Sequence, residues 1–301
     1  MLFAAAGCKR PLPQKSDGKL NVVSVIFPSY DFVRAIAGDK VNLVMLLSPG
    51  AESHSYEPSP KDIVTIQESD LFIYPGGENS AWVDRILESI KTPKMKVLKM
   101  TDLVNTVEEE TVEGMDTGGD SEETGPVYDE HVWTAPENAK SIVAAITDSL
   151  CALDPANAEM YRGNAADYSK RLDELDATFR SIVEGAKRKT IVFGDRFPFR
   201  YFTDAYGLKY YAAFPGCSIE TEPSAGTVAF LINKIKSENI PVVFYIELSN
   251  EKMADTISEA TGAKKLLLHS CHNVTKNDFE KGVSYLDIQK MNAEHLREAL
   301  W

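Results

Sequence analysis

The sequence lacks the features that mark nucleic-acid-binding proteins, membrane-spanning proteins and the common hydrolases. Its 32 Lys and Arg stand against 45 Asp and Glu, a formal net charge of -13, so it offers no basic surface for phosphate backbones. No segment reaches the roughly 18 consecutive apolar residues that a transmembrane helix needs. Neither an HExxH nor a GxSxG motif is present. These absences argue against nucleic acid as a partner, against a membrane span and against the best-known hydrolase mechanisms.

Cysteine is also scarce, and each of the four has a distinct context. Cys8 ends a short apolar run that resembles a lipoprotein cleavage box, so we expect residues 1–18 to be a signal remnant and a tether, with Cys8 acylated. The alternative is an ordinary frayed terminus. Cys217 and Cys271 fall in predicted loops and could form a disulfide outside the cytoplasm. Cys151 lies in an apolar helical pattern and is expected to be a buried thiol.

Strand-like and helix-like segments alternate along both halves of the chain. Strands are expected at residues 20–26, 41–47, 70–74, 95–100, 190–194, 208–213, 242–246 and 264–268. Such alternation predicts parallel sheets flanked by helices. The sequence therefore predicts an α/β fold of two lobes, residues 19–154 and 188–301.

Two further segments shape this organisation. Residues 155–187 carry an apolar stripe at spacings of three and four, which predicts one long helix of about 45 Å linking the lobes. Residues 108–130 hold ten carboxylates and no Lys or Arg. We expect an acidic loop there, which either gathers cations loosely or is a solvated insertion without a role.

Four of the five histidines fall in loops, and the fifth, His295, is expected on a helix surface. His54 and His131 each lie where a strand leads into a helix, and Glu247 and His269 directly follow predicted strands of the second half. Ligands of open α/β sheets bind at such edges. One loop histidine is usually a surface residue, but this set could close a metal site between the lobes, with zinc or manganese as the ion.

The order of motifs resembles that of the metal-specific solute-binding proteins of bacterial ABC importers, which deliver zinc or manganese to a membrane permease. The resemblance covers residues 19–300. Its motifs are HSYEPSP (54–60), DLFIY (70–74), AWVD (81–84), HVW (131–133) with PENA (136–139), FRYF (199–202) with YGL (206–208), ETEPSA (220–225) and ATGAK (260–264). The family's fold implies two α/β lobes joined by one rigid helix.

The resemblance also implies a ligand set, with one departure. The family's first, second and fourth ligands map onto His54, His131 and His269. The third falls on Arg196, whose guanidinium does not ligate metals. The residues that could fill this vacancy are Glu247, His272 and Asp195, and a water could also do so. We favour Glu247, and we expect Arg196 to pair with Glu220 or Glu222. Three imidazoles favour Zn²⁺ over Mn²⁺.

By this resemblance the chain is expected to be a monomeric, lipid-anchored, extracytoplasmic receptor at the cell surface or in the periplasm. It would carry zinc, or alternatively manganese, to the transmembrane subunit of an ABC permease, and would not be an enzyme. Two other interpretations stay open. One is a surface adhesin or interaction protein that keeps this fold, and the other is a zinc hydrolase.

Overall fold

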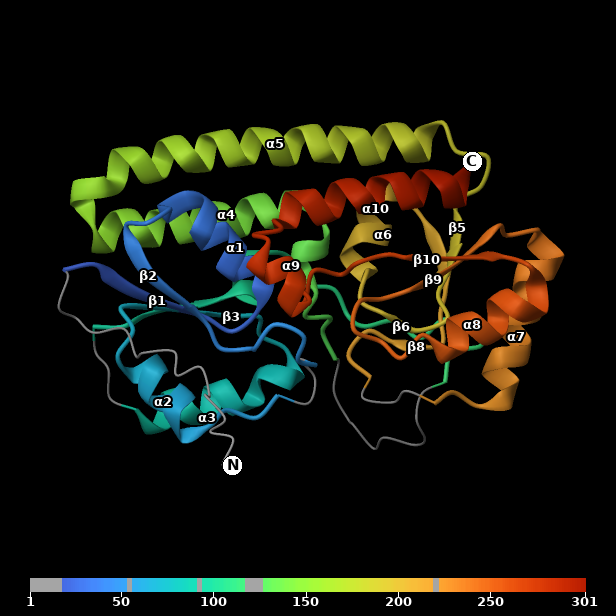
Figure 1. The fold of residues 1–301 in the computed structure, drawn as a ribbon, viewed down its shortest axis with the longest axis horizontal. Helices are drawn as coiled ribbons and strands as arrows, with labels where there is room; N and C mark the ends of the chain where they lie inside the picture. The colour runs from blue at the N-terminus through green and yellow to red at the C-terminus, as the bar shows by residue number, and fades with distance from the viewer. Residues whose placement is uncertain (1–17, 53–55, 91–93, 117–126, 219–221) are drawn as a thin grey trace, which may run out of the picture.

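The computed structural model has two α/β lobes side by side, with a long helix lying along both (Figure 1). It describes residues 18–52, 56–90, 94–116, 127–218 and 222–301. The predictions made for Cys8, His54 and Glu220 therefore lie outside the described residues. The mixed α/β architecture with parallel sheets flanked by helices is the predicted one, and this prediction is confirmed.

The first lobe is built on one parallel sheet with the strand order β2-β1-β3-β4. Its strands are β1 (Leu20–Ser24), β2 (Val41–Met45), β3 (Leu71–Tyr74) and β4 (Lys96–Lys99). Its helices are α1 (Phe27–Ala37), α2 (Pro60–Gln67), α3 (Ala81–Ser89) and α4 (Pro136–Leu153). Helices α1 and α4 lie on one face and α2 and α3 on the other (Figure 1). The central strand β3 is apolar throughout and wholly buried because both faces are covered.

The second lobe repeats this plan with shorter strands. Its parallel pairs are β5 (Thr190–Val192) with β7 (Lys209–Tyr211), β9 (Val242–Tyr245) with β10 (Lys264–Leu267), and β6 (Arg196–Phe197) with β8 (Phe214–Pro215). A parallel bridge between Phe193 and Phe244 connects the first two pairs. Helices α6 (Arg200–Tyr206), α7 (Ala225–Glu238) and α8 (Lys252–Thr261) accompany these strands.

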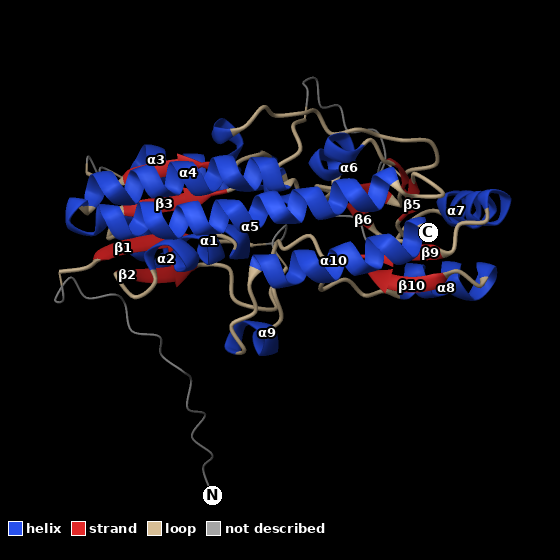
Figure 2. Cartoon of the chain, turned by 90° about the horizontal axis from the view of Figure 1, so that it is seen from above, coloured by secondary structure: helices blue, strands red, loops and turns tan. Residues whose placement is uncertain are grey.

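Helix α5 (Ala158–Glu184) lies along both lobes (Figures 1 and 2). It contacts α1 and α4 of the first lobe and α10 (Tyr285–Leu300), which follows the short helix α9 (Lys276–Glu280). The predicted apolar stripe is its buried face, and its 27 residues span about 40 Å. No helix among the described residues combines the length and the apolar character needed to cross a membrane.

Buried hydrogen bonds connect the two lobes beside the long helices. The indole Nε1 of Trp133 donates to the Ser270 carbonyl at 2.7 Å, and the Tyr285 hydroxyl donates to the Trp133 carbonyl at 2.7 Å. The backbone N–H of Tyr285 donates to Asp31 of α1, also at 2.7 Å. Because all four residues are buried, these bonds fix the segment around Trp133 against the loop that contains Ser270.

Candidate metal centre

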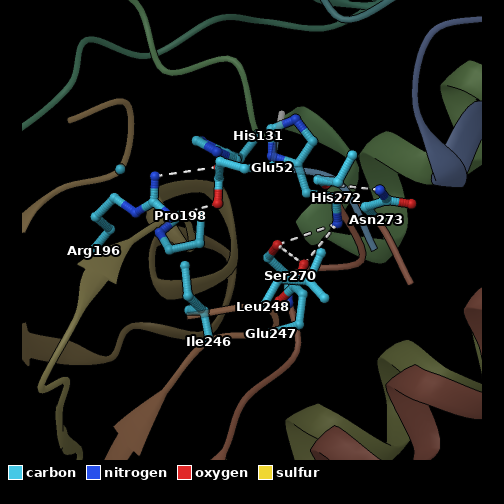
Figure 3. Close-up of a pocket in the computed structure, with 12 residues that line it drawn as sticks. Glu52, His131, Arg196, Pro198, Ile246, Glu247, Leu248, Ser270, His272 and Asn273 are labelled. Atoms are coloured by element: carbon cyan, nitrogen blue, oxygen red, sulfur yellow. Dashed lines mark hydrogen bonds and ion pairs between the residues drawn. The ribbon is translucent and has the colours of Figure 1, made fainter. Parts of the chain in front are cut away.

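A small cavity of about 20 Å³ lies between the lobes. This is room for one water or one small ion. Its lining comes from loops of the first lobe and from strand ends and loops of the second (Figure 3). The residues are Ala51, Glu52, His131, Arg196, Pro198, Gly216, Ile246, Glu247, Leu248, Ser270, His272 and Asn273.

His131 is held by the carboxylate two residues before it. Asp129 Oδ1 accepts a hydrogen bond from the His131 backbone N–H at 2.7 Å and lies 2.9 Å from Nδ1 of the ring. The Tyr201 hydroxyl of the second lobe donates to the Asp129 carbonyl at 2.7 Å. This bond anchors the Asp129–His131 segment of the first lobe to the second lobe. A carboxylate on one ring nitrogen sets the tautomer and leaves Nε2 as the nitrogen that could ligate a metal. Asp129 is thus a positioning residue for His131.

The surroundings of His131 are buried and acidic. Burial lowers the pKa of His131, but the charge and hydrogen bond of Asp129, with Glu130 and Glu109 nearby, outweigh it, so the net shift is upward. Burial raises the pKa of Glu130 to about 7. Burial also raises the pKa of Glu109, which accepts a hydrogen bond from Cys217 N at 2.7 Å. This concentration of carboxyl groups favours a cation at the edge of the cavity.

His272 reaches the cavity from the loop after β10. Cys271 has a φ of 67°, a conformation that non-glycine residues seldom adopt. The backbone turns at this residue, so the side chain of His272 points to the cavity and that of His269 does not. The ring of His272 lies 5.3 Å from that of His131 and 5.0 Å from that of Trp133, measured between centroids. Imidazoles from the two lobes therefore meet beside one cavity.

Glu247 and His269, both predicted as ligands, hold this loop in place. Glu247 accepts hydrogen bonds from Ser270 N at 2.7 Å and His272 N at 3.0 Å, and a further one from the Ser270 hydroxyl. His269 Nδ1 accepts one from Cys271 N at 3.0 Å. His269 is not among the residues that line the cavity. The structure thus brings His272 to His131, where the sequence had favoured His269.

The described contacts pair Arg196 with Glu52 and not with the predicted Glu222, while the predicted Glu220 lies outside the described residues. The guanidinium of Arg196 donates to Glu52, from Nη2 to Oε2 at 3.1 Å and from Nη1 to Oε1 at 3.4 Å, and to the Ser218 carbonyl at 3.4 Å. The predicted partners were Glu220 and Glu222. Figure 3 shows this pair at one side of the cavity, with Glu52 between Arg196 and His131. A cation from the second lobe thus meets a carboxylate from the first, at the position of the missing ligand.

The carboxylate of Asp195, a third candidate ligand, accepts hydrogen bonds from backbone N–H groups. Its Oδ1 accepts from Arg196 N at 2.8 Å and its Oδ2 from Ile246 N at 3.4 Å. Burial raises its pKa. These bonds fix the direction of the strand that carries Arg196.

The predicted disulfide between Cys217 and Cys271 is absent from the structure. Cys217 and Cys271 are both free, so the disulfide between them is not formed. Cys271 is wholly buried and accepts a hydrogen bond from Gln289, and Cys217 lies beside Glu109. Cys151 is free and buried, as its helical pattern predicted.

Among the described residues, one group has the composition and spacing of a metal site. Ligand atoms of Glu130, His131 and His272 all lie within 4.8 Å of one another, and all three residues are buried. Imidazole nitrogen and carboxylate oxygen are ligands that zinc accepts. Sequence reasoning weighed His272 but missed Glu130 and Asp129, although both end the acidic segment directly before His131.

Comparison with known proteins agrees with this geometry. A family model described as "Zinc-uptake complex component A periplasmic" matches residues 22–299. The chain belongs to this family. Members of the family are metal-binding transport proteins rather than enzymes, so the zinc-hydrolase interpretation is not supported. The predicted resemblance to the zinc-uptake solute-binding proteins is confirmed.

Individual relatives support the same assignment. The chain is 32% identical over 303 residues to the high-affinity zinc uptake system protein ZnuA of Bacillus subtilis, covering 100% of this chain and 94% of that protein. It is 33% identical over 286 residues to the zinc-binding lipoprotein AdcA of Streptococcus pneumoniae. That match covers 95% of this chain and 56% of AdcA, so the chain spans about half of that relative.

Solved structures match over nearly the whole chain. The crystal structure of the Zn(II)-bound ZnuA-like domain of Streptococcus pneumoniae AdcA matches with a TM-score of 0.78 at 32% identity, covering 94% of this chain and 99% of that one. The laminin-binding protein Lmb of Streptococcus agalactiae, described as bifunctional with adhesin and metal transporting activity, matches with a TM-score of 0.78 at 26% identity. The match covers 94% of this chain and 100% of the Lmb chain.

Proposed function

We propose that the chain is the extracytoplasmic receptor of an ABC importer and takes up Zn²⁺ between its two lobes. The observation that carries this proposal is the meeting of His131 and His272, one from each lobe, beside a cavity with room for one ion. Their separation in the sequence means that only the folded protein brings them together. Binding between lobes couples capture of the ion to their relative position.

The proposed ligands are His131 and His272, with His54 as a third that rests on the sequence motif alone. His269 and Glu247, the ligands first expected in the second lobe, are assigned instead to shaping the loop that presents His272. Two or three imidazoles favour zinc over manganese, because manganese prefers oxygen ligands. Manganese is the alternative cargo.

The remaining parts of the proposal concern the surroundings of the protein. We propose a lipid anchor at Cys8, a tether up to residue 18, and a monomer that docks on the transmembrane subunit of a permease. The lobe limits 19–154 and 188–301, with the linking segment 155–187 and the acidic loop 108–130, are proposed as the domain organisation. Names of relatives that include "lipoprotein" and "uptake system" support this picture.

Metal content tests the proposal directly. The purified full chain, loaded with zinc and dialysed, is expected to hold about one zinc per chain by elemental analysis. A His131→Ala, His272→Ala double variant is expected to hold none, while His295→Ala, which changes a histidine outside the cavity, keeps it. Loss of zinc-dependent growth in cells that carry only the double variant would extend the result to uptake. A wild-type chain that holds no zinc would contradict the proposal.

An adhesin role is the second candidate, favoured by the match to Lmb. It predicts binding to immobilised laminin by the metal-free double variant as well as by the wild type. Absence of laminin binding in both would remove this candidate.

A further inference from the structure

The proposed zinc site lacks one ligand, and the structure shows why. Zinc in protein sites is almost always four-coordinate. Arg196 stands where a further ligand is expected, its side chain is buried beside the cavity, and it presents only N–H donors. Its bidentate pair with Glu52 neutralises its charge but commits both carboxylate oxygens of Glu52. A donor from elsewhere must complete the coordination.

Most carboxylates around the cavity already hold other groups. Asp129 is bound to His131, Asp195 to two backbone N–H groups, and Glu247 to the loop that carries His272. Glu109 accepts from Cys217 N. Moving any of these onto a metal would break the contacts that shape the site and leave buried polar groups unpaired.

Glu130 differs from these residues. It is 1% exposed, its Oε1 accepts a single long hydrogen bond from Asn79 at 3.4 Å, and its Oε2 is buried with no hydrogen-bond partner among the described residues. A buried carboxylate with an unpaired oxygen is unfavourable unless a cation or a bound proton compensates its charge. Glu130 also belongs to the one group in the described part of the chain whose ligand atoms lie within 4.8 Å of one another, with His131 and His272.

We infer that Glu130 supplies the carboxylate ligand that Arg196 cannot provide, binding zinc together with His131 and His272. This inference rests on the proposed zinc-binding function and names one of its ligands. Ligand atoms around a tetrahedral zinc lie roughly 3.3 Å apart, given bond lengths near 2 Å. A small inward shift of the three side chains is enough to close the site. The charge of Glu130 would offset that of the ion in the buried site.

Gly77 makes room for this side chain. A Cβ at position 77 would lie 2.7 Å from Oε2 and 2.8 Å from Cβ of Glu130. Gly77 also has a φ of 74°, which favours glycine. The turn before α3 therefore leaves space for the Glu130 carboxylate beside the two histidines.

Zinc affinity of matched variants tests the inference. Glu130→Gln keeps the shape of the side chain and removes its charge, and we expect it to weaken zinc binding at least about tenfold in competition titrations. Glu137→Gln, on an exposed acid of α4 that does not line the cavity, is the control and is expected to leave zinc affinity unchanged. With Co²⁺ as a probe, the visible absorption of Glu130→Gln is expected to change, because a ligand is replaced, while that of Glu137→Gln keeps the wild-type form. Equal affinities and spectra for wild type and Glu130→Gln would overturn the inference.

A zinc-loaded crystal of the wild type gives a second test that does not depend on any variant folding. We expect a Glu130 oxygen at about 2.0 to 2.2 Å from the ion. Zinc bound to His131 and His272 with Glu130 held away from it would overturn the assignment of Glu130 alone. A wild-type chain without zinc would overturn the proposed function, and the assignment with it.

Discussion

Arg196 of the second lobe forms a bidentate ion pair with Glu52 of the first, with N···O distances of 3.1 and 3.4 Å, beside two histidines that could hold a metal. The pair bridges the lobes at the place where the family resemblance puts a ligand. The Arg196 side chain is 7% exposed and that of Glu52 is 37% exposed, so solvent screens the interaction on the Glu52 side. The pair therefore contributes to closing the cleft on one side, while metal coordination would close it on the other.

Replacing Arg196 with histidine tests this account of the departure from the family pattern. We expect Arg196→His to bind zinc about tenfold more tightly or better, because it exchanges a fixed cation for a nitrogen ligand. Arg196→Gln is the control, since it removes the charge without adding an imidazole. Competition titration with a zinc chelator measures both. If Arg196→His binds no more tightly than Arg196→Gln, position 196 does not face the ion.

The contact between Asp129 and His131 predicts that a substitution of Asp129 weakens zinc binding while the protein still folds. Asp129→Asn keeps an acceptor oxygen next to Nδ1 but removes the charge that orients the ring and makes it more basic. Loss of such a partner typically costs a metal site about 10- to 100-fold in affinity. Zinc titration measures the loss, and circular dichroism should match that of the wild type. The exposed Asp102 supplies the control variant Asp102→Asn, for which unchanged affinity is expected.

The start of α10 predicts a stability effect that depends on pH. Ser284 and Asp287 form a reciprocal capping box, and the hydrogen bond from the Ser284 hydroxyl lowers the pKa of Asp287. A lowered pKa stabilises the fold at pH values above the pKa of the unfolded chain, and this contribution disappears as the pH falls through the lowered value. Ser284→Ala is expected to reduce the free energy of unfolding by about 1 kcal/mol at neutral pH.

Urea denaturation at neutral pH and at about pH 3 measures this dependence. The difference between wild type and Ser284→Ala should shrink as the pH falls towards and through the lowered pKa of Asp287. A difference that stays constant or grows would show that the cap does not act through the charge of Asp287.

Periodic features of the fold could be predicted from the sequence. The apolar stripe of residues 155–187 predicted α5, which runs from Ala158 to Glu184, because a long helix repeats the same local signal many times. The alternation of strand-like and helix-like segments predicted the parallel strands of both lobes for a similar reason. His131 was found because it lies at a strand-to-helix loop and in a recognisable motif, both of which are local features.

The details of the site depend on tertiary structure and could not be predicted in the same way. His269 and His272 lie three residues apart in one loop, and which one reaches the cavity depends on the positive φ of Cys271, the hydrogen bonds of Glu247 and those of Asn292 to the His269 backbone. Likewise, the ion pair of Arg196 with Glu52 joins distant parts of the chain. The residues next to Arg196 and next to Glu52 in the sequence carry no pattern that predicts this ion pair.

The central claim is that His131 and His272 share one zinc ion, and anomalous diffraction at the zinc edge tests it most directly. Crystals of the wild-type chain grown with zinc should show one strong anomalous peak within about 2.0 to 2.1 Å of a ring nitrogen of each histidine. A peak located elsewhere, or no peak in the cavity when zinc is supplied in excess, would contradict the account.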